Sequence, residues 1–341
     1  MASIVYLLRL PAVFGLALVV QALVCAVPVM AQTPSAAPAA SCLILTTYPV
    51  GAGEHPHDVA PAADGQHVWY TAQAAGQLGL LDPQTGKIEL IPLGQGSAPH
   101  GVIVGPDDAA WVTDGGLNAI VRVDSETHDV KTFPVDVPSA NLNTAVFDAD
   151  GILWFTGQSG VVGRLDPRSG QMTTTTDTNG RGPYGITSTV GGDVFFASLA
   201  GSFLGKATFK DGAISIEVLE PPTSGAGTRR VWSDSKGIIW TSEWNAGQIG
   251  RYDPASGDWR EWKLPGAAPQ TYAVYVDEHD LVWLSDFGGN ALVRFNPATE
   301  TFDTFALPDP NGSVRQILGR KGEIWAAESA ADKIVSVTAS C

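Results

Sequence analysis

The sequence predicts an all-β protein, a seven-bladed β-propeller that is closed by its own N-terminal strand. Two observations predict it. The 341 residues include 38 Gly and 23 Pro, a composition typical of many short strands joined by tight turns. An aromatic anchor also recurs at steps of 41 to 45 residues, which is the length of a four-stranded blade repeated about an axis. The seven anchors are Trp69, Trp111, Trp154, Phe195, Trp240, Trp283 and Trp325.

Each repeated unit contains the same parts in the same order. A turn such as "DADG" (148–151) leads into the second strand, where glycine accepts a positive φ. The large aromatic residue of that strand, as in "GIIWTSE" (237–243), is expected to fill the gap between neighbouring blades. Turns such as "DPRSG" (166–170) then connect the third strand to the fourth. We interpret these repeated parts as scaffold.

The two ends of the propeller are predicted to meet. The last unit contains only three strands, whereas residues 42–50 have the pattern of a fourth strand with no blade before it. We therefore expect residues 42–50 to complete the seventh blade, so that the propeller spans 42–341. Cys42 and Cys341 would then lie on adjacent strands, and a disulfide between them is expected in an oxidising compartment.

The N-terminal segment predicts export. Residues 1–31 contain one cation, a long apolar run and a small-residue cleavage site ending at Ala31, as in a secretory signal peptide. The alternative is an uncleaved anchor, because the run approaches the about 20 residues that span a bilayer. Residues 32–41 are interpreted as a linker. We expect a periplasmic or secreted monomer that has no membrane contact after cleavage.

The charge of the chain limits its partners. The formal net charge of −15 argues against nucleic acid and against anionic membrane surfaces. It is compatible with a cationic ligand or a metal. No GxSxG, Walker, HExxH or CxxC motif is present, so serine hydrolysis, nucleotide hydrolysis and zinc sites have no support in the sequence.

Candidate functional residues are expected around the mouth of the central channel, where the innermost strands begin and the loops after the second strands lie. Eleven residues before each anchor, give or take one residue, the seven units carry different residues, although their anchors are alike. These positions hold His57, His100, Asn143, Tyr184, Arg229, Tyr272 and Arg315. The contrast predicts a small-molecule or peptide ligand at the mouth.

The two histidines are candidate catalytic residues. His57 and His100 occupy equivalent positions in adjacent units, and Asp114 lies one loop away from His100. A histidine oriented by a carboxylate can act as general base or metal ligand; it can also simply hydrogen-bond within a loop. Glu243 and Asp286, which follow their anchors by three residues, either bind a cation or cap backbone amides.

Other mouth residues are predicted to bind substrate. Arg229, Arg230 and Arg315 could hold an anionic or carbonyl group, or they could neutralise Glu243 and Glu328. Trp244 offers a stacking surface or packs at a blade edge. The predicted substrate-binding set is Tyr184, Arg229, Trp244, Tyr272 and Arg315.

Three stretches carry a resemblance to a known family. "PHGVIVGPDDAAWVTDGGLNAIVRVD" (99–124), "PYGI" (183–186) and "IIWTSEWNAGQIGRYDP" (238–254) resemble the virginiamycin B lyase, or streptogramin lyase, family. The likeness covers all seven repeats. It implies a seven-bladed propeller that linearises type B streptogramins by elimination across the ester linkage, without water and with a magnesium ion.

The resemblance also implies roles for individual residues. The family's proton-transferring histidines lie in Pro-His motifs of two consecutive blades, which match Pro99-His100 and Pro56-His57. His100 is thereby cast as general base or acid and His57 as its partner. Asp114 is cast as metal ligand or histidine orienter, and Asp114 with Glu243 forms the expected Mg²⁺ site. The family's pair belongs to the last two blades, however, where this chain has Tyr272 and Arg315.

The sequence thus predicts an exported, metal-dependent carbon–oxygen lyase that opens a cyclic depsipeptide or related ester. Two alternatives remain. One is a non-catalytic propeller that binds a ligand or protein through the same face. The other is a lactone hydrolase of a related propeller type, which would use a metal held by residues such as Asn143 and Glu243.

Overall fold

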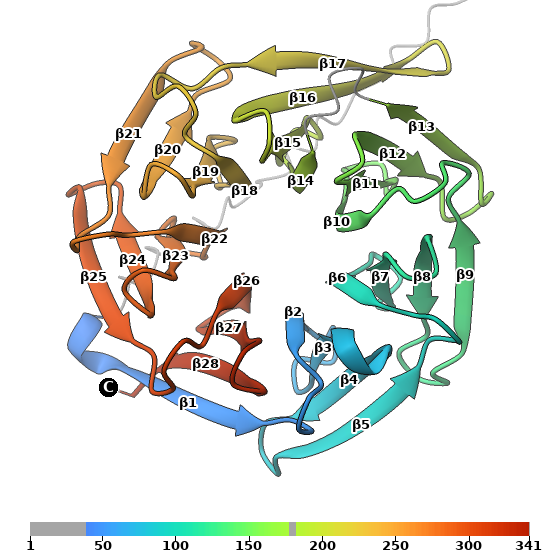
Figure 1. Ribbon diagram of the computed structural model, residues 1–341, viewed down its shortest axis with the longest axis horizontal. Coiled ribbons are helices and arrows are strands. Elements are labelled where there is room, and N and C mark those ends of the chain that lie inside the picture. Colours follow the sequence, from blue (N-terminus) through green and yellow to red (C-terminus); the bar gives the residue numbers. More distant parts are fainter. Residues whose placement is uncertain (1–38, 177–181, 341) are drawn as a thin grey trace, which may run out of the picture. The chain divides into compact units, whose positions relative to one another are not determined.

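The computed structural model describes residues 39–176 and 182–340. These residues form seven antiparallel sheets of four strands, arranged as blades around a common axis (Figure 1). Two 3₁₀ helices, η1 (Ala40–Cys42) and η2 (Gln73–Ala75), accompany the strands. The predicted seven-bladed propeller is confirmed. The predicted signal peptide and most of the predicted linker lie outside the described residues. Within the described part of the chain, no helix is long and apolar enough to cross a membrane.

The strands follow the chain blade by blade, each blade running from the axis outwards. Blades 1 to 3 consist of β2 (Pro56–Pro61), β3 (Val68–Ala72), β4 (Gln77–Asp82) and β5 (Lys87–Pro92); β6 (Pro99–Val104), β7 (Ala110–Asp114), β8 (Ala119–Val123) and β9 (Val130–Pro134); and β10 (Leu142–Phe147), β11 (Leu153–Gly157), β12 (Val161–Leu165) and β13 (Met172–Thr176). Blades 4 to 6 consist of β14 (Pro183–Ser188), β15 (Val194–Ser198), β16 (Phe203–Lys210) and β17 (Ala213–Leu219); β18 (Thr228–Ser233), β19 (Ile239–Glu243), β20 (Gln248–Tyr252) and β21 (Trp259–Lys263); and β22 (Thr271–Val276), β23 (Val282–Asp286), β24 (Ala291–Asn296) and β25 (Thr301–Ala306).

Blade 7 joins the two ends of the described chain. Its inner strands are β26 (Val314–Arg320), β27 (Glu323–Glu328) and β28 (Lys333–Ala339), and its outer strand is β1 (Leu43–Pro49). In Figure 1 the blue β1 runs along the red β28, and their register pairs Leu43 with Ala339. The predicted closure by the N-terminal strand is therefore confirmed. Cys341 lies outside the described residues, so the disulfide with Cys42 stays a prediction.

The aromatic anchors pack between blades as expected. All seven lie on the second strand of a blade, and none is more than 4% exposed. A buried indole N–H needs an acceptor, and in blades 2, 3, 5 and 6 an Asp of the turn before the strand supplies it. Trp154 donates to Asp148 at 2.7 Å and Trp240 to Asp234 at 3.1 Å. The Asp of the "DADG" turn thus both shapes the turn and satisfies the anchor.

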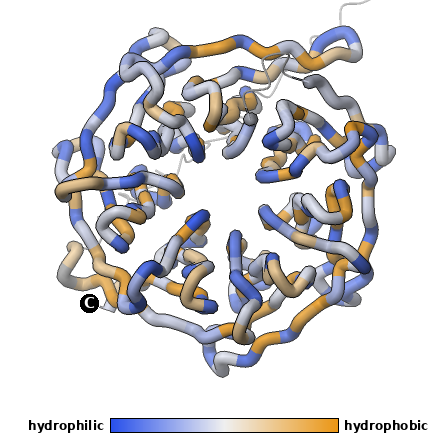
Figure 2. Tube along the Cα trace, viewed as in Figure 1, coloured by the Kyte–Doolittle hydropathy of each residue, from blue (hydrophilic) through white to orange (hydrophobic). Residues whose placement is uncertain are grey.

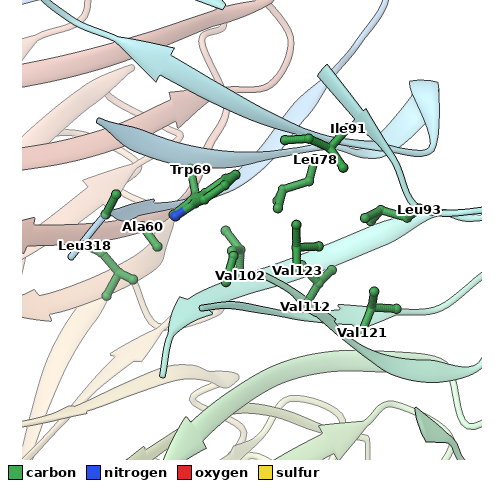
Figure 3. Packing of buried hydrophobic residues seen from close by; sticks show 12 residues of the cluster. Ala60, Trp69, Leu78, Ile91, Leu93, Val102, Val112, Val121, Val123 and Leu318 are labelled. Atoms are coloured by element: carbon green, nitrogen blue, oxygen red, sulfur yellow. The ribbon is translucent and has the colours of Figure 1, made fainter. Parts of the chain in front are cut away.

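The core is divided among the interfaces between blades. One cluster joins blades 1 and 2, with Trp69 and Leu78 facing Val102, Val112 and Val121 (Figure 3). Each such side chain contributes about 1.5–3 kcal/mol when it is fully buried. Figure 2 shows hydrophilic segments at the axial ends of several blades. The apolar interior therefore supports a polar surface around the axis.

Hydroxyl groups two residues after the anchors connect neighbouring inner strands. Thr71 Oγ1 accepts the backbone N–H of Asp58 at 3.0 Å and donates to the carbonyl of His100, in the next blade, at 2.9 Å. The same bridge is formed by Thr113, Thr156, Ser242 and Ser285. The repeated "xWxT" motif thus fixes the axial ends of adjacent blades relative to each other.

A register break occurs in each inner strand, close to the mouth. In blade 1 it falls between Pro56 and Val59, and all seven pairs of first and second strands show it. A bulge interrupts the alternation of side chains along a strand and can aim consecutive residues at the same site. The residues inside the blade 1 break are His57 and Asp58.

Candidate active site at the channel mouth

Two histidines meet at the axis. His57 on β2 and His100 on β6 have ring centroids 3.8 Å apart, with the ring planes inclined at 45°. Both are at most 8% exposed. The expectation that equivalent positions in adjacent blades bring these rings together agrees with this geometry. Thr71 contributes directly, because it bridges the backbones of Asp58 and His100.

The carboxylate beside this pair is Asp58. Its Oδ1 lies 2.7 Å from His57 Nδ1 and 3.0 Å from Nη2 of Arg230, which reaches it from β18 in blade 5. Burial raises the pKa of Asp58, while Arg230 and His100 oppose the rise. An ionised carboxylate only accepts hydrogen bonds, so we assign the proton of neutral His57 to Nδ1. Its Nε2 is then left with a lone pair.

A second chain of hydrogen bonds sets the tautomer of His100. Arg230 Nη1 donates to Thr144 Oγ1 at 2.7 Å, and that hydroxyl donates to Asn143 Oδ1 at 2.8 Å. The amide nitrogen of Asn143 then lies 3.1 Å from His100 Nε2. Because an amide nitrogen only donates, Nε2 is assigned as an acceptor and the proton of His100 to Nδ1. Nδ1 is buried and has no hydrogen-bond partner in the described part of the chain.

Both imidazoles are held neutral. Burial, followed by Arg230, Arg315 and Arg229, lowers the pKa of His57 well below its usual value. Burial, followed by the neighbouring ring of His57, lowers the pKa of His100 in the same direction. Both rings are protonated on Nδ1, and the neutral pair offers one lone pair, on Nε2 of His57, and one N–H donor, on Nδ1 of His100. This is the arrangement that proton transfer requires.

Tyrosines and an arginine form the opposite wall. The hydroxyl groups of Tyr184 and Tyr272 hydrogen-bond to each other. Burial and the proximity of Tyr272 raise the pKa of Tyr184 to about 12. Burial would also raise the pKa of Tyr272, but the positive charges of Arg229 and Arg230 lower it. The guanidinium carbon of Arg229 lies 3.6 Å from the ring centroid of Tyr272 and 5.0 Å from that of Tyr184.

Two further aromatic rings extend this wall. Trp244 lies 4.9 Å from the Arg229 guanidinium carbon and meets Tyr272 edge to face, with centroids 5.8 Å apart. Phe287 stacks on Tyr272 at 5.0 Å. Arg315 approaches Tyr272 to 5.8 Å while its Nε donates to Ser329. All five residues predicted to bind substrate are therefore brought together at the mouth.

The predicted acidic residues lie elsewhere. Asp114 accepts hydrogen bonds from Ser97, Ala98 and Leu117, and it takes none from a histidine. The orienting position expected for Asp114 is occupied by Asp58. Asp286 caps the amides of Gln270 and Gly288. Glu243 accepts from Gln248 and Thr241, and burial raises its pKa to about 7. The structure does not gather Asp114 and Glu243 into one ligand set.

The donors do not suit a magnesium ion. Among the described residues, one group has metal-ligand geometry: His57, Asp58 and His100, whose donor atoms lie within 4.8 Å of one another. Mg²⁺ prefers octahedral oxygen coordination, and this group offers a single carboxylate. One oxygen of that carboxylate already binds His57 and Arg230. The positive charges of three arginines also act on this site. The Mg²⁺ that the resemblance implies is therefore not matched by these side chains.

Three contributors were not predicted from the sequence. Asp58 and Thr144 directly follow His57 and Asn143, and regular strand alternation would send them to the opposite face. The bulges bring them to the same site. Phe287 lies in the loop after β23, where the prediction considered only polar residues. A usable signal was present, because polar pairs occupy the same repeat position in four blades: His57-Asp58, Asn143-Thr144, Arg229-Arg230 and Arg315-Gln316.

The fold and the site together define a seven-bladed propeller that carries a buried histidine pair at its channel mouth. The virginiamycin B lyase family matches residues 43–254, and the chain belongs to that family. A virginiamycin B lyase of Nocardia farcinica (strain IFM 10152) is 31% identical over 186 residues, which cover 54% of this chain and 62% of that protein. The match thus spans less than two thirds of the relative's length.

Solved structures support the fold. A streptogramin B lyase superimposes with a TM-score of 0.80 and 22% identity, covering 87% of this chain and 98% of its own. Virginiamycin B lyase from Staphylococcus aureus gives a TM-score of 0.80 with 21% identity, covering 87% and 99%. A catalytically inactive histidine-to-alanine variant of the latter, solved with quinupristin, gives 0.79 with 21% identity and the same coverage.

Proposed function

We propose that the protein is an exported carbon–oxygen lyase that opens a cyclic depsipeptide or related ester by elimination at the channel mouth. The observation that carries the proposal is the adjacent pair of His57, which has a free Nε2 lone pair, and His100, which has an unused Nδ1–H donor. Membership of the virginiamycin B lyase family supports the reaction type. The relative that loses activity when a histidine is replaced supports histidine-dependent chemistry.

In the proposed step, His57 is the base. Its Nε2 lone pair takes the proton from the carbon next to a carbonyl group. The electron pair of that C–H bond forms a carbon–carbon double bond, and the C–O bond of the ester breaks. The ester leaves as a carboxylate, so no water is consumed. His100 hydrogen-bonds the reacting group through Nδ1–H, the donor that no described protein group uses.

Export is part of the proposal. The apolar segment 1–31 is expected to be cleaved, which leaves a periplasmic or secreted propeller. We propose that it acts as a monomer on a small cyclic ester, without nucleic acid or membrane. The lactone-hydrolase alternative has less support, because Asn143 bonds to His100 while Glu243 bonds to Gln248.

The distinguishing experiment measures the mass of the product. The purified propeller is incubated with a type B streptogramin and the products are separated by chromatography. Elimination predicts a linear product with the same mass as the substrate and new absorbance from the double bond. Hydrolysis would add the mass of one water molecule, and absence of any product would favour a non-catalytic binding propeller.

Variants assign the role of the histidine pair in the same assay. General base catalysis is worth about 10²–10⁴-fold, so we expect His57→Ala to lower the rate by at least about 100-fold. His67→Ala is the matched control, because His67 lies in the turn before β3 and pairs with Asp64. Equal rates for His57→Ala and the wild type would exclude the proposed base.

A further inference from the structure

Two arginines at the mouth lack an acidic partner. No ion pair joins Arg229 or Arg315 to a carboxylate in the described part of the chain. Arg229 Nε is buried without a hydrogen-bond partner, and Arg315 Nε donates only to the hydroxyl of Ser329. The sequence-based alternative that these arginines neutralise Glu243 and Glu328 is not realised. Glu243 pairs with neutral groups, and no arginine hydrogen-bonds to Glu328 in the described part of the chain.

Arg229 and Arg315 pack against a cluster of aromatic rings. The guanidinium carbons of Arg229 and Arg315 lie 3.6 and 5.8 Å from the ring centroid of Tyr272. Trp244 covers Arg229 from another side at 4.9 Å, and Phe287 stacks beneath Tyr272. Aromatic faces stabilise and orient a guanidinium group. A ring face does not replace an acceptor in the plane of the group, and Nε of Arg229 has none among the described residues.

The local charge is opposite to that of the whole protein. Three arginines meet at the mouth, and the single carboxylate among them, that of Asp58, is already bound to Arg230. The chain as a whole carries −15. A partly desolvated cation without a counter-charge destabilises the fold. Binding an anion from outside the protein supplies that counter-charge. A divalent cation or another cationic partner would be repelled by these arginines.

We propose that the mouth binds the carboxylate of an organic acid through Arg229 and Arg315, with the apolar part of that acid against Trp244 and Phe287. The inference rests on the proposed function for its catalytic consequence. When the ester C–O bond breaks, its electron pair moves to the leaving oxygen, and the leaving group becomes a carboxylate. The two guanidinium groups meet that charge as it develops. They thereby take the part that a metal ion would otherwise play.

Binding is measured on protein dialysed against EDTA, so that no divalent ion contributes. N-acetyl-L-phenylalanine serves as the carboxylate probe, and its uncharged primary amide is the matched control. Hydrogen bonds to charged groups predict that the acid binds about tenfold or more tightly than the amide. We expect Arg229→Gln and Arg315→Gln each to weaken acid binding about tenfold. Arg251→Gln should leave it unchanged, because Arg251 lies in the same blade as Arg229 and pairs with Asp253.

Three results would overturn the inference. One is equal binding of acid and amide. Another is tighter binding of inorganic phosphate than of the acid. The third is a requirement for Mg²⁺ or Zn²⁺ in acid binding, which would show that a metal and not the arginines holds the carboxylate. Calorimetry with each ligand and each metal alone separates these cases, and circular dichroism verifies that the variants are folded.

The anion site and the lyase reaction fail in different ways. If the acid binds and Arg229→Gln removes binding, but no cyclic ester reacts, the anion site stands and the elimination is wrong. If an ester is opened while the acid does not bind, the elimination stands and the anion site is wrong. If both hold, Arg229→Gln should lower the rate of elimination while Arg251→Gln does not.

Discussion

Asp58 is the side chain on which the geometry of the mouth depends, because it bonds to both His57 and Arg230. Arg230 continues the chain through Thr144 and Asn143 to His100. One buried ion pair therefore sets the proton positions of both imidazoles. This explains why a carboxylate adjacent to His57 in sequence matters more than Asp114, which caps a loop.

Breaking this ion pair should destabilise the fold. Asp58→Asn leaves the buried Arg230 guanidinium without its counter-charge, a change that costs about 3–5 kcal/mol. Urea unfolding followed by tryptophan fluorescence measures the free energy of unfolding. The double variant Asp58→Asn, Arg230→Gln should recover much of the loss. A loss below about 1 kcal/mol in the single variant would contradict the assigned role of the pair.

The depressed pKa of His57 predicts the acidic side of the pH–rate profile. A base must be unprotonated to act, so activity falls as the pH drops below its pKa. Burial and the three nearby arginines place that pKa well below 6.5. The midpoint of the fall in kcat/KM should therefore lie below pH 6.5. A limb centred at or above pH 6.5 would mean that His57 is solvated or is not the base.

At the scale of strands, the hydroxyl bridges connect scaffold to site. Thr71 bridges the inner strands that carry His57 and His100, whereas Ser285 forms the same bridge between blades 6 and 7. The two positions are equivalent in the repeat, but the histidine pair lies beside only one of them. They therefore form a natural comparison between local positioning and general stability.

We expect Thr71→Val to reduce kcat about tenfold or more with a small change in KM, because the histidines lose their relative position. The net contribution of the lost hydrogen bonds is about 1 kcal/mol each. Ser285→Ala should lower the free energy of unfolding by a comparable amount and leave kcat nearly unchanged. Steady-state kinetics and thermal unfolding of both variants provide the measurement. Equal losses of kcat in both would show that the bridge acts only through stability.

The strands also show what could be predicted from the sequence. The period, the anchors and the closing strand follow from patterns that repeat seven times, so the fold and the adjacency of His57 and His100 were predictable. The role of Asp58 was not predictable, because a bulge overrides the alternation of side chains along the strand and no sequence motif within one unit indicates the bulge. Arg230 joins blade 1 from blade 5, and such a contact across the axis leaves no trace in local spacing.

At the scale of the molecule, the pairing of β1 with β28 closes the ring. The β1 strand pairs with β28 along seven residue pairs, from Leu43↔Ala339 to Pro49↔Lys333. Without β1, the edge of β28 would be open to pairing with other chains. The backbone N–H of Ser340 also bonds to the carbonyl of Cys42 at 2.7 Å. The predicted partner of Cys42 follows directly after Ser340 in the sequence.

The predicted disulfide would lock this closure. For a loop of nearly 300 residues, loop entropy gives up to about 5 kcal/mol. We expect Cys42→Ser and Cys341→Ser each to lower the free energy of unfolding by an amount that approaches this limit. The double variant should be no worse than either single one. Titration of the unreduced mature protein should find no free thiol, and two reactive thiols would contradict the pairing.

The central claim is that His57 and His100 form a neutral pair in which both rings are protonated on Nδ1, Nε2 of His57 keeps a free lone pair and Nε2 of His100 accepts from Asn143. The ¹⁵N chemical shifts of the imidazole nitrogens in ¹⁵N-histidine-labelled protein at pH 7 test it most directly, with His57→Gln and His100→Gln used to assign the signals. We expect a protonated Nδ1 and an unprotonated Nε2 in both rings, with the Nε2 of His100 shifted by its hydrogen bond from Asn143 and that of His57 unshifted. An imidazolium signal from either ring, or an Nε2-protonated His57, would contradict the account.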